Sequence, residues 1–196
     1  MTAQIPDYFQ LNYNEFDVTG VNGSGLFDPL YYGLTPIGIN SMCWRGQICK
    51  YELVQKNLVM RDLWVSNGKL EKGVFQSQTG PIINDIQPIS GERSDCHFNC
   101  WYRNLNIQVA FTGGLLLGKD FFSDRYEWIA FRRPWQFQIA FELIFDDGRL
   151  KCCNDISQTM ERVRDQVEEK LLSPFIDERH QAREWIKETF NLDYHF

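Results

Sequence analysis

The spacing of apolar residues changes once along this chain, near Asn154, and that change limits the possible folds more than any other feature. Before it, short segments with an apolar residue at every second position are separated by turns rich in Gly, Asn and Asp, which is typical of β-strands. After it, apolar residues recur every three or four positions, as on one face of an α-helix. We therefore expect an α+β fold, in which a flat or strongly curved antiparallel β-sheet is followed by two C-terminal α-helices packed on it.

One alternation in the β-rich part is clearer than the others. Over residues 101–111, apolar side chains fall on one face of a predicted strand and polar side chains on the other. Residues 75–92 contain two prolines and show no periodicity, so we predict a long loop there. The apolar face of the clear strand consists of Trp101, Leu105, Ile107, Val109 and Phe111. The other strands are predicted at residues 8–13, 16–18, 44–54, 58–65, 138–145 and 149–153.

The helical part carries two apolar stripes, one for each predicted helix. Because an apolar stripe is costly to leave in water, we expect the first helix to cover the apolar face of residues 101–111. The length of 196 residues suits a single domain over residues 1–196, with a β-rich part at 1–153 and a helical part at 154–196. The first stripe is Ile156, Met160, Val163, Val167 and Leu171, and the second is Ile176, Trp185, Ile186 and Phe190.

The charge balance restricts the classes of partner. The chain has 20 Lys and Arg against 26 Asp and Glu, a formal net charge of −6 with His counted as neutral. A surface of this sign repels phosphate backbones, so we expect no nucleic-acid partner. The apolar runs are far shorter than the ~20 residues that cross a bilayer, and the start, MTAQIPDYFQ, lacks a basic segment followed by an apolar one. We therefore expect a cytoplasmic protein that does not bind membranes.

The six cysteines could form disulfides or hold a metal ion. In the reducing compartment expected here, a disulfide framework is not favoured. Only Cys96, His97 and Cys100 have a spacing typical of zinc ligands, and they would need further ligands from elsewhere in the chain. Cys43 and Cys49 would lie about 20 Å apart along an extended strand, too far to share one ion. Buried thiols explain the same residues, so we expect no metal and no cofactor.

Two further segments contain residues that could indicate a binding or catalytic site. The run from Gly113 to Asp120 has the Gly and Gly-Lys spacing of a phosphate-binding loop, but Asp120 stands where a Ser or Thr should hold magnesium. Its surroundings predict antiparallel strands, so we interpret it as a connection between strands. Glu142 interrupts an apolar run, and we expect it to be exposed or paired with a cation rather than to act as a catalytic acid. No Ser/His/Asp or Cys/His arrangement can be recognised.

Aromatic residues are unusually frequent, with 15 Phe, 8 Tyr and 6 Trp making up 15% of the chain. Large aromatic side chains stabilise cores, and they also line ligand pockets and protein interfaces, often beside Arg. We therefore take the aromatic residues that stand next to an Arg as candidates for ligand or partner binding. These candidates are Trp44, Arg45, Trp101, Tyr102, Arg132, Arg133 and Trp135.

One predicted hairpin is similar to that of a known family. The segments Cys43-Trp44-Arg45-Gly46, Tyr51-Glu52-Leu53 and Leu58 to Asp62-Leu63 resemble the Trp-Arg-Gly … Tyr/Trp-Glu-Ile/Leu … Leu-x-x-x-Asp-Leu hairpin of a family of small bacterial proteins of unassigned function. The resemblance covers residues 43–150, although Gln47 replaces the aromatic residue usual after Gly46. It implies a bacterial, cytoplasmic protein with a strand connection at residues 113–120. It implies no activity, cofactor or catalytic residue.

Three functions remain open at this stage. Acidity, aromatic residues and the lack of a catalytic constellation favour a non-catalytic intracellular partner-binding protein, of the immunity-like kind that neutralises a basic partner. The alternative is a small-molecule-binding domain with an aromatic pocket between sheet and helices, which would take a small apolar or aromatic ligand. A second alternative is a hydrolase whose site is assembled from distant residues. An enzyme is the less favoured class.

Overall fold

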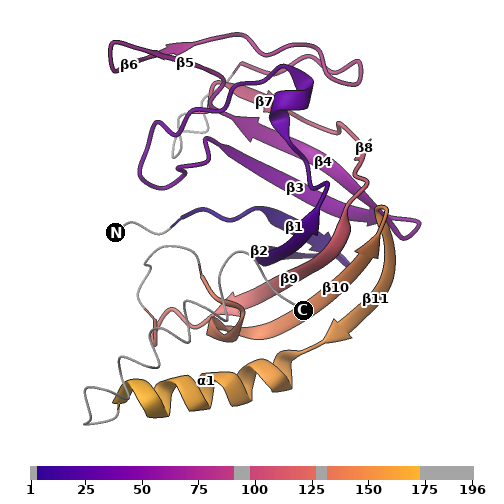
Figure 1. Ribbon diagram of the computed structural model, residues 1–196, viewed down its shortest axis with the longest axis vertical. Coiled ribbons are helices and arrows are strands. Elements are labelled where there is room, and N and C mark those ends of the chain that lie inside the picture. The colour runs from indigo at the N-terminus through magenta and orange to yellow at the C-terminus, as the bar shows by residue number, and fades with distance from the viewer. Residues whose placement is uncertain (1–3, 91–97, 127–131, 173–196) are drawn as a thin grey trace.

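The computed structural model describes residues 4–90, 98–126 and 132–172 (Figure 1). The described part of the protein is mostly β. The strands are β1 (Tyr8–Leu11), β2 (Asn14–Ser24), β3 (Gln47–Val54), β4 (Asn57–Val65), β5 (Gly68–Glu71), β6 (Val74–Ser77), β7 (Cys100–Tyr102), β8 (Ile107–Gln108), β9 (Thr112–Phe121), β10 (Phe137–Asp146) and β11 (Arg149–Asp155). Two short 3₁₀-helices, η1 (Pro29–Tyr32) and η2 (Pro134–Gln136), and one α-helix, α1 (Ser157–Leu172), complete the described part of the chain.

Seven strands close into a barrel in the order β11-β10-β9-β2-β1-β3-β4. The barrel closes where β11 meets β4, by pairing of Arg149 with Asn57 and by a hydrogen bond from Leu58 N to Gly148 O (2.7 Å). The strands of this barrel are paired antiparallel except for β1 and β3, which run parallel. The predicted α+β fold with an antiparallel sheet is therefore wrong. Alternation within a strand indicates which face of that strand is buried, but not which strand lies beside it. The closure of a sheet into a barrel therefore cannot be predicted from this pattern.

Apolar side chains fill the interior of the barrel. Phe9 of β1 lies opposite Phe16 of β2 on one side and Tyr51 of β3 on the other, and all three are buried. These side chains alternate with outward-facing polar ones, as the period of two in a strand requires. The same interior holds Leu115 and Leu117 of β9, and Leu143 and Phe145 of β10.

The predicted strand over residues 101–111 is interrupted in the middle. Asn104 and Asn106 adopt left-handed backbone conformations (φ 55° and 51°), which Asn tolerates better than most residues, so only β7 and β8 remain extended. As a result Tyr102 is buried in the barrel core, whereas Trp101 stacks on Trp64 of β4 outside it (ring centroids 5.8 Å apart). The prediction that Trp101 shares a face with the later apolar residues is wrong. Leu105, Val109 and Phe111 do lie together in the core.

Residues 113–120 form the middle of β9, between β2 and β10, and are not a strand connection. Gly113 (φ 148°) stands where β9 passes close to β2, since a Cβ atom on Gly113 would lie 2.0 Å from the carbonyl oxygen of Asn22. Gly23 of β2 faces it, with φ 141° and the same kind of crowding against Thr112 O. These glycines allow two backbones to pack together, so Gly113 of the phosphate-loop spacing has a packing role.

The C-terminal helix α1 packs on the outside of the barrel, against β10 and η2 (Figure 1). Met160 and Val167 are buried against Ala140 and Trp135, with Ile156 and Val163 packed beside them, so the predicted stripe is confirmed as far as Val167. The side chain of Leu171 lies outside the described residues. The predicted docking face is wrong, because the apolar side chains of residues 105–111 point into the barrel. The buried Arg164 fixes the helix by donating from Nε to Trp135 O and from Nη2 to Phe137 O, each at 2.9 Å.

The second predicted helix, residues 176–190, lies outside the described residues. Within the described part of the chain, no helix has both the length and the apolar composition needed to cross a membrane.

Candidate partner-binding surface

Two segments, residues 26–40 and 66–90, form a layer at the end of the molecule where β4 ends, and we call this layer the cap (Figure 1). The cap contains η1 and the β5–β6 hairpin, and β5 and β6 pair with each other rather than with the barrel. The long loop predicted at residues 75–92 is found at residues 78–90, within the second segment. Residues 75–77 belong to β6 instead, and residues 91–92 lie outside the described residues. Loops of this length need specific bonds to hold one conformation.

Asn67 supplies many of those bonds. Its side-chain oxygen accepts from Thr35 N (2.7 Å), and its side-chain nitrogen donates to Gln78 O (3.2 Å). The side chain of Asn99 completes the arrangement, since it accepts from Asn67 N (2.7 Å) and donates to Asn67 O (2.9 Å). Asn67 is buried, so these bonds satisfy polar groups that would otherwise be costly to keep from water. Both cap segments are thereby fastened to one point beside β7.

The barrel core holds the later part of the cap. The hydroxyl of Tyr102 donates to Pro81 O (2.8 Å), and Gly80 lies so close that a Cβ atom there would come within 2.1 Å of that hydroxyl. Burial raises the pKa of the Tyr102 hydroxyl, which therefore remains a donor at neutral pH. Asn84 adds a bond from its side chain to Leu105 O (2.6 Å). The loop is thus fixed on the barrel rather than loosely draped over it.

The short helix η1 is closed at both ends by local bonds. The Asp28 side chain accepts from Leu30 N (2.9 Å), and Gly33 ends the helix in a left-handed conformation (φ 72°) beside the ring of Pro81. Tyr32 stacks on Phe27, with ring centroids 5.1 Å apart. The stacking contact covers part of the Tyr32 ring, and the neighbouring side chains of Leu30 and Tyr31 are more exposed.

Large apolar side chains are exposed mainly on the cap. Of the eleven such side chains exposed among the described residues, seven lie on cap segments, and their exposed fractions range from 36% to 88%. Scattered exposed apolar residues are ordinary, but their concentration on one part of a molecule marks an interaction site. We call these seven the cap surface: Leu30, Tyr31, Tyr32, Leu70, Val74, Ile82 and Ile89.

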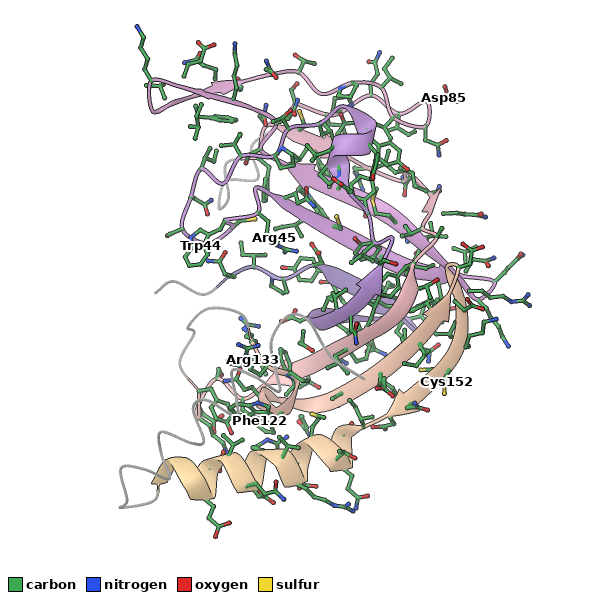
Figure 2. The ribbon with its side chains drawn as sticks, in the orientation of Figure 1. Trp44, Arg45, Asp85, Phe122, Arg133 and Cys152 are labelled. Atoms are coloured by element: carbon green, nitrogen blue, oxygen red, sulfur yellow. The ribbon has the colours of Figure 1, made fainter. Side chains whose placement is uncertain are left out.

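The first two candidates from the sequence lie outside the cap. Trp44 is exposed, and its backbone nitrogen donates to the side chain of Gln4 (3.0 Å). The Arg45 guanidinium donates to the Asp7 carboxylate (2.7 Å) and to Ile5 O (3.1 Å), so it fastens the N-terminal segment to the start of β3. Figure 2 shows Trp44 and Arg45 together, well separated from Arg133. Arg45 therefore has a structural role, and Trp44 is the candidate of this pair that remains available for contact.

The second pair, Trp101 and Tyr102, point to opposite faces of β7. Trp101 stacks on Trp64, and the Arg103 guanidinium lies 4.7 Å from the centre of the Trp101 ring. Its indole nitrogen is buried and has no hydrogen-bond partner among the described residues. Tyr102 is the core residue that holds Pro81 of the cap. Of this pair, Tyr102 acts on the cap surface indirectly, by positioning it.

The last three candidates surround η2, at the opposite part of the molecule. Arg132 forms an ion pair with Asp17 (2.9 Å) and lies over the ring of Phe121. Arg133 begins η2, where its backbone nitrogen donates to the Gln136 side chain (2.7 Å) and burial lowers the pKa of its guanidinium. Trp135 is buried under α1. The seven candidates are therefore distributed over three places and do not form a single site.

The structure also places the candidate metal ligands and Glu142. Cys96 and His97 lie outside the described residues, and Cys100 is buried, which raises the pKa of its thiol. Within the described ranges no three potential ligands come together to hold a metal ion, and the five described cysteines are free thiols. Glu142 accepts a hydrogen bond from the Asn154 side chain (3.0 Å) across the β10–β11 pair.

In comparison with known proteins, no family model, curated protein or solved structure matches the chain.

Sequence reasoning missed the cap surface as a whole. Its members are aliphatic or tyrosine residues in segments without periodicity, and none of them stands next to an Arg. A usable signal was the presence of apolar residues such as Ile82 and Ile89 in a Pro-containing loop, although Ile83 of the same loop is buried in the barrel core.

Proposed function

We propose that the protein is a non-catalytic binding protein that holds another protein on its cap surface. The observation that carries the proposal is the concentration of exposed apolar side chains, seven of eleven among the described residues, on the cap. Exposed apolar area favours association because it leaves water when a partner covers it. Tyr residues such as Tyr31, 88% exposed, are frequent anchors of protein interfaces.

The rigid attachment of the cap supports the same proposal. A surface that is already ordered loses less conformational entropy on binding than a mobile loop does, so more of its contact energy contributes to affinity. The bonds of Asn67 and Tyr102 supply this order.

The partner we propose is a basic protein. The net charge of −6 favours encounter with a basic surface, whereas the cap itself carries three acidic and two basic residues and is nearly neutral. Apolar contacts on the cap would then determine affinity, and the overall charge would determine the rate of association. An immunity-like role is the specific form of this proposal, in which the basic partner harms the cell when this chain is absent.

A photo-crosslinking amino acid placed at Tyr31 tests the proposal in the native cells. We expect one discrete adduct, and mass spectrometry should identify its partner as a basic protein. The matched control places the same amino acid at Tyr13, which is fully exposed but lies in the β1–β2 turn outside the cap.

The comparison between the two positions decides the outcome. An adduct at position 31 that is absent at position 13 supports the cap as the binding surface. Equal adducts at both positions, or none at position 31, would contradict it. A partner whose expression alone does no harm would remove the immunity-like form while leaving partner binding intact.

A further inference from the structure

A hollow of about 410 Å³ opens into the barrel at some distance from the cap, between the β1–β2 turn and the start of α1. Its apolar walls are Leu11, Phe16, Ile139 and Phe141, and the rings of Phe16 and Phe141 meet edge to face with centroids 5.7 Å apart. The volume falls within the range of roughly 300–1,000 Å³ that is usual for small-molecule sites. An apolar wall of this kind favours a ligand with an apolar body.

Strand register explains why these side chains converge. Phe16 faces the core, and Lys119 lies on the same face of β9 as the core residues Leu115 and Leu117. Lys119 stands directly opposite Ile139 in the β9–β10 pair, and directly opposite residues share a face. The apolar wall of the hollow and Lys119 therefore occupy inward-facing positions, and exposed polar residues such as Asn14 and Gln138 border the opening.

The incomplete closure of the barrel keeps the hollow open. β11 pairs with β4 at a single position, Arg149 with Asn57, and its C-terminal half has no strand on that side within the described residues. Asp155, at the end of β11, pairs with Phe141 of β10 and borders the opening. A ligand could therefore enter without unfolding a strand.

The charges at the rim are of opposite sign but differ in their partners. The Asp155 carboxylate accepts from Ser157 N (2.9 Å) and Ser157 Oγ (2.6 Å), so it is used at the start of α1. The Lys119 ammonium donates to the side-chain oxygen of Asn14 (2.8 Å), and no carboxylate of the described residues lies within ion-pair distance of it. Asn14 is itself held by a bond to Asn12 O (3.1 Å), which fixes the position of the lysine. The positive charge is the one that a ligand could neutralise.

We infer that this hollow binds a small amphipathic monocarboxylate, whose apolar tail lies on Phe16, Ile139 and Phe141 and whose carboxylate pairs with Lys119. Charge complementarity at Lys119 selects the headgroup, and the apolar wall selects the tail. Ligands with an aliphatic tail and ligands with an aromatic tail both fit this description, and the experiment below distinguishes the two classes. This binding site is independent of the cap surface and of the partner proposed for it.

Calorimetric titration with three eight-carbon ligands tests the headgroup. Octanoate, octan-1-ol and octylammonium differ in charge, and their unbranched alkyl tails differ by at most one carbon. We expect octanoate to bind at least about tenfold more tightly than octylammonium, because a charge-assisted bond in a partly buried site adds that much affinity. 3-Phenylpropionate, titrated in parallel, shows whether an aromatic tail is preferred to an aliphatic one.

The variant Lys119→Met assigns the effect to this lysine. It should weaken octanoate binding about tenfold and leave octan-1-ol binding unchanged, since the apolar wall is intact. Lys151→Met is the matched control, because it removes the same charge from β11 at a position that does not line the hollow and should change neither affinity. Equal weakening by both substitutions would overturn the inference.

Methyl NMR locates the ligand and separates this site from adsorption on the cap. Octanoate should shift the methyl resonances of Leu11 and Ile139 and leave those of Leu70 and Val74, on the exposed β5–β6 hairpin, unchanged. Shifts confined to the hairpin, a preference for octylammonium, or no binding of any of the ligands would each overturn the inference.

Discussion

The hydroxyl of Tyr102, which is completely buried, donates a hydrogen bond to the carbonyl oxygen of Pro81 in the cap at 2.8 Å. This bond links the closed barrel to the surface that we propose for partner binding. It reaches Pro81 past Gly80, where any side chain would collide with the hydroxyl. The same residue thus belongs to the core and positions the cap.

Removing that hydroxyl should destabilise the protein. We expect Tyr102→Phe to lower the free energy of unfolding by about 1–2 kcal/mol, because it deletes a buried hydrogen bond and leaves Pro81 O without its donor. Urea titration measures the change. Tyr13→Phe is the control, since Tyr13 is fully exposed and its substitution should change stability by less than about 0.5 kcal/mol. Equal stability of the two variants would show that the Tyr102–Pro81 bond does not hold the cap.

Arg45 should prove structural rather than part of a binding site. Arg45→Met removes the partner of the Asp7 carboxylate, which is buried just before β1 and also accepts from Cys49 N of β3 (2.8 Å). We expect a loss of about 1–3 kcal/mol, reduced from the value for a fully buried pair because the Arg45 side chain is 35% exposed.

The control for Arg45 is another ion pair of the same barrel. Lys50 and Glu15 pair on the outer surface, and Lys50→Met should cost no more than about 1 kcal/mol. Thermal and urea unfolding of both variants gives the comparison. If Lys50→Met were the more harmful change, the role assigned to the Asp7–Arg45 pair would be incorrect.

Asp17 should contribute a measurable pH dependence of stability. Burial raises the pKa of its carboxyl group above the ordinary value of 3.8, and the Arg132 guanidinium, which lowers that pKa, offsets burial only in part. A carboxyl group with a higher pKa in the folded state binds its proton more tightly there. Its contribution to stability is therefore greatest at low pH and is lost as the pH rises through the folded-state pKa.

The variant Asp17→Asn lacks this titration. We predict that its free energy of unfolding, relative to the original chain, rises as the pH increases from 3.8 through the raised pKa. Urea titrations of both chains across this pH range measure the difference. A difference that falls with increasing pH would mean that the ion pair with Arg132 outweighs burial.

Local pattern predicted much of the β structure but not its closure. The alternation of residues 138–145 correctly indicated β10, with Leu143 and Phe145 on the buried face. Barrel closure depends on the pairing of Arg149 with Asn57. These two residues are far apart in the chain, and the sequence around them has no distinctive motif. A single pair of this kind becomes visible only when all strands are placed together.

Glycine and asparagine residues account for two wrong secondary-structure predictions, and the reason is physical. Both residues are typical of turns, so the pair Gly113-Gly114 predicted a connection where the structure has β9. The actual role of Gly113 is close packing, since a Cβ atom there would lie 2.0 Å from Asn22 O. At Asn104 the error was opposite, because an uninterrupted alternation concealed a real break in the strand.

The candidate surface was less predictable than the fold. Aromatic residues beside Arg were predicted to form a binding site. Instead Arg45 and Tyr102 make internal hydrogen bonds, and Trp135 packs under α1. The position of the cap segments depends on the bonds of Asn67, which join segments over thirty positions apart in the chain. Sequence spacing carries no information on such a bond.

The affinity of the crosslinked partner for cap variants tests the central claim most directly. The variants Tyr31→Ser and Ile82→Ser remove exposed apolar side chains without disturbing the core, and Tyr13→Ser serves as the control outside the cap. Calorimetry with the purified partner should show that each cap substitution weakens binding at least about tenfold, as expected for an interface anchor, while Tyr13→Ser leaves the Kd unchanged. A Kd that is the same for all three variants and the original chain would contradict the assignment of partner binding to the cap surface.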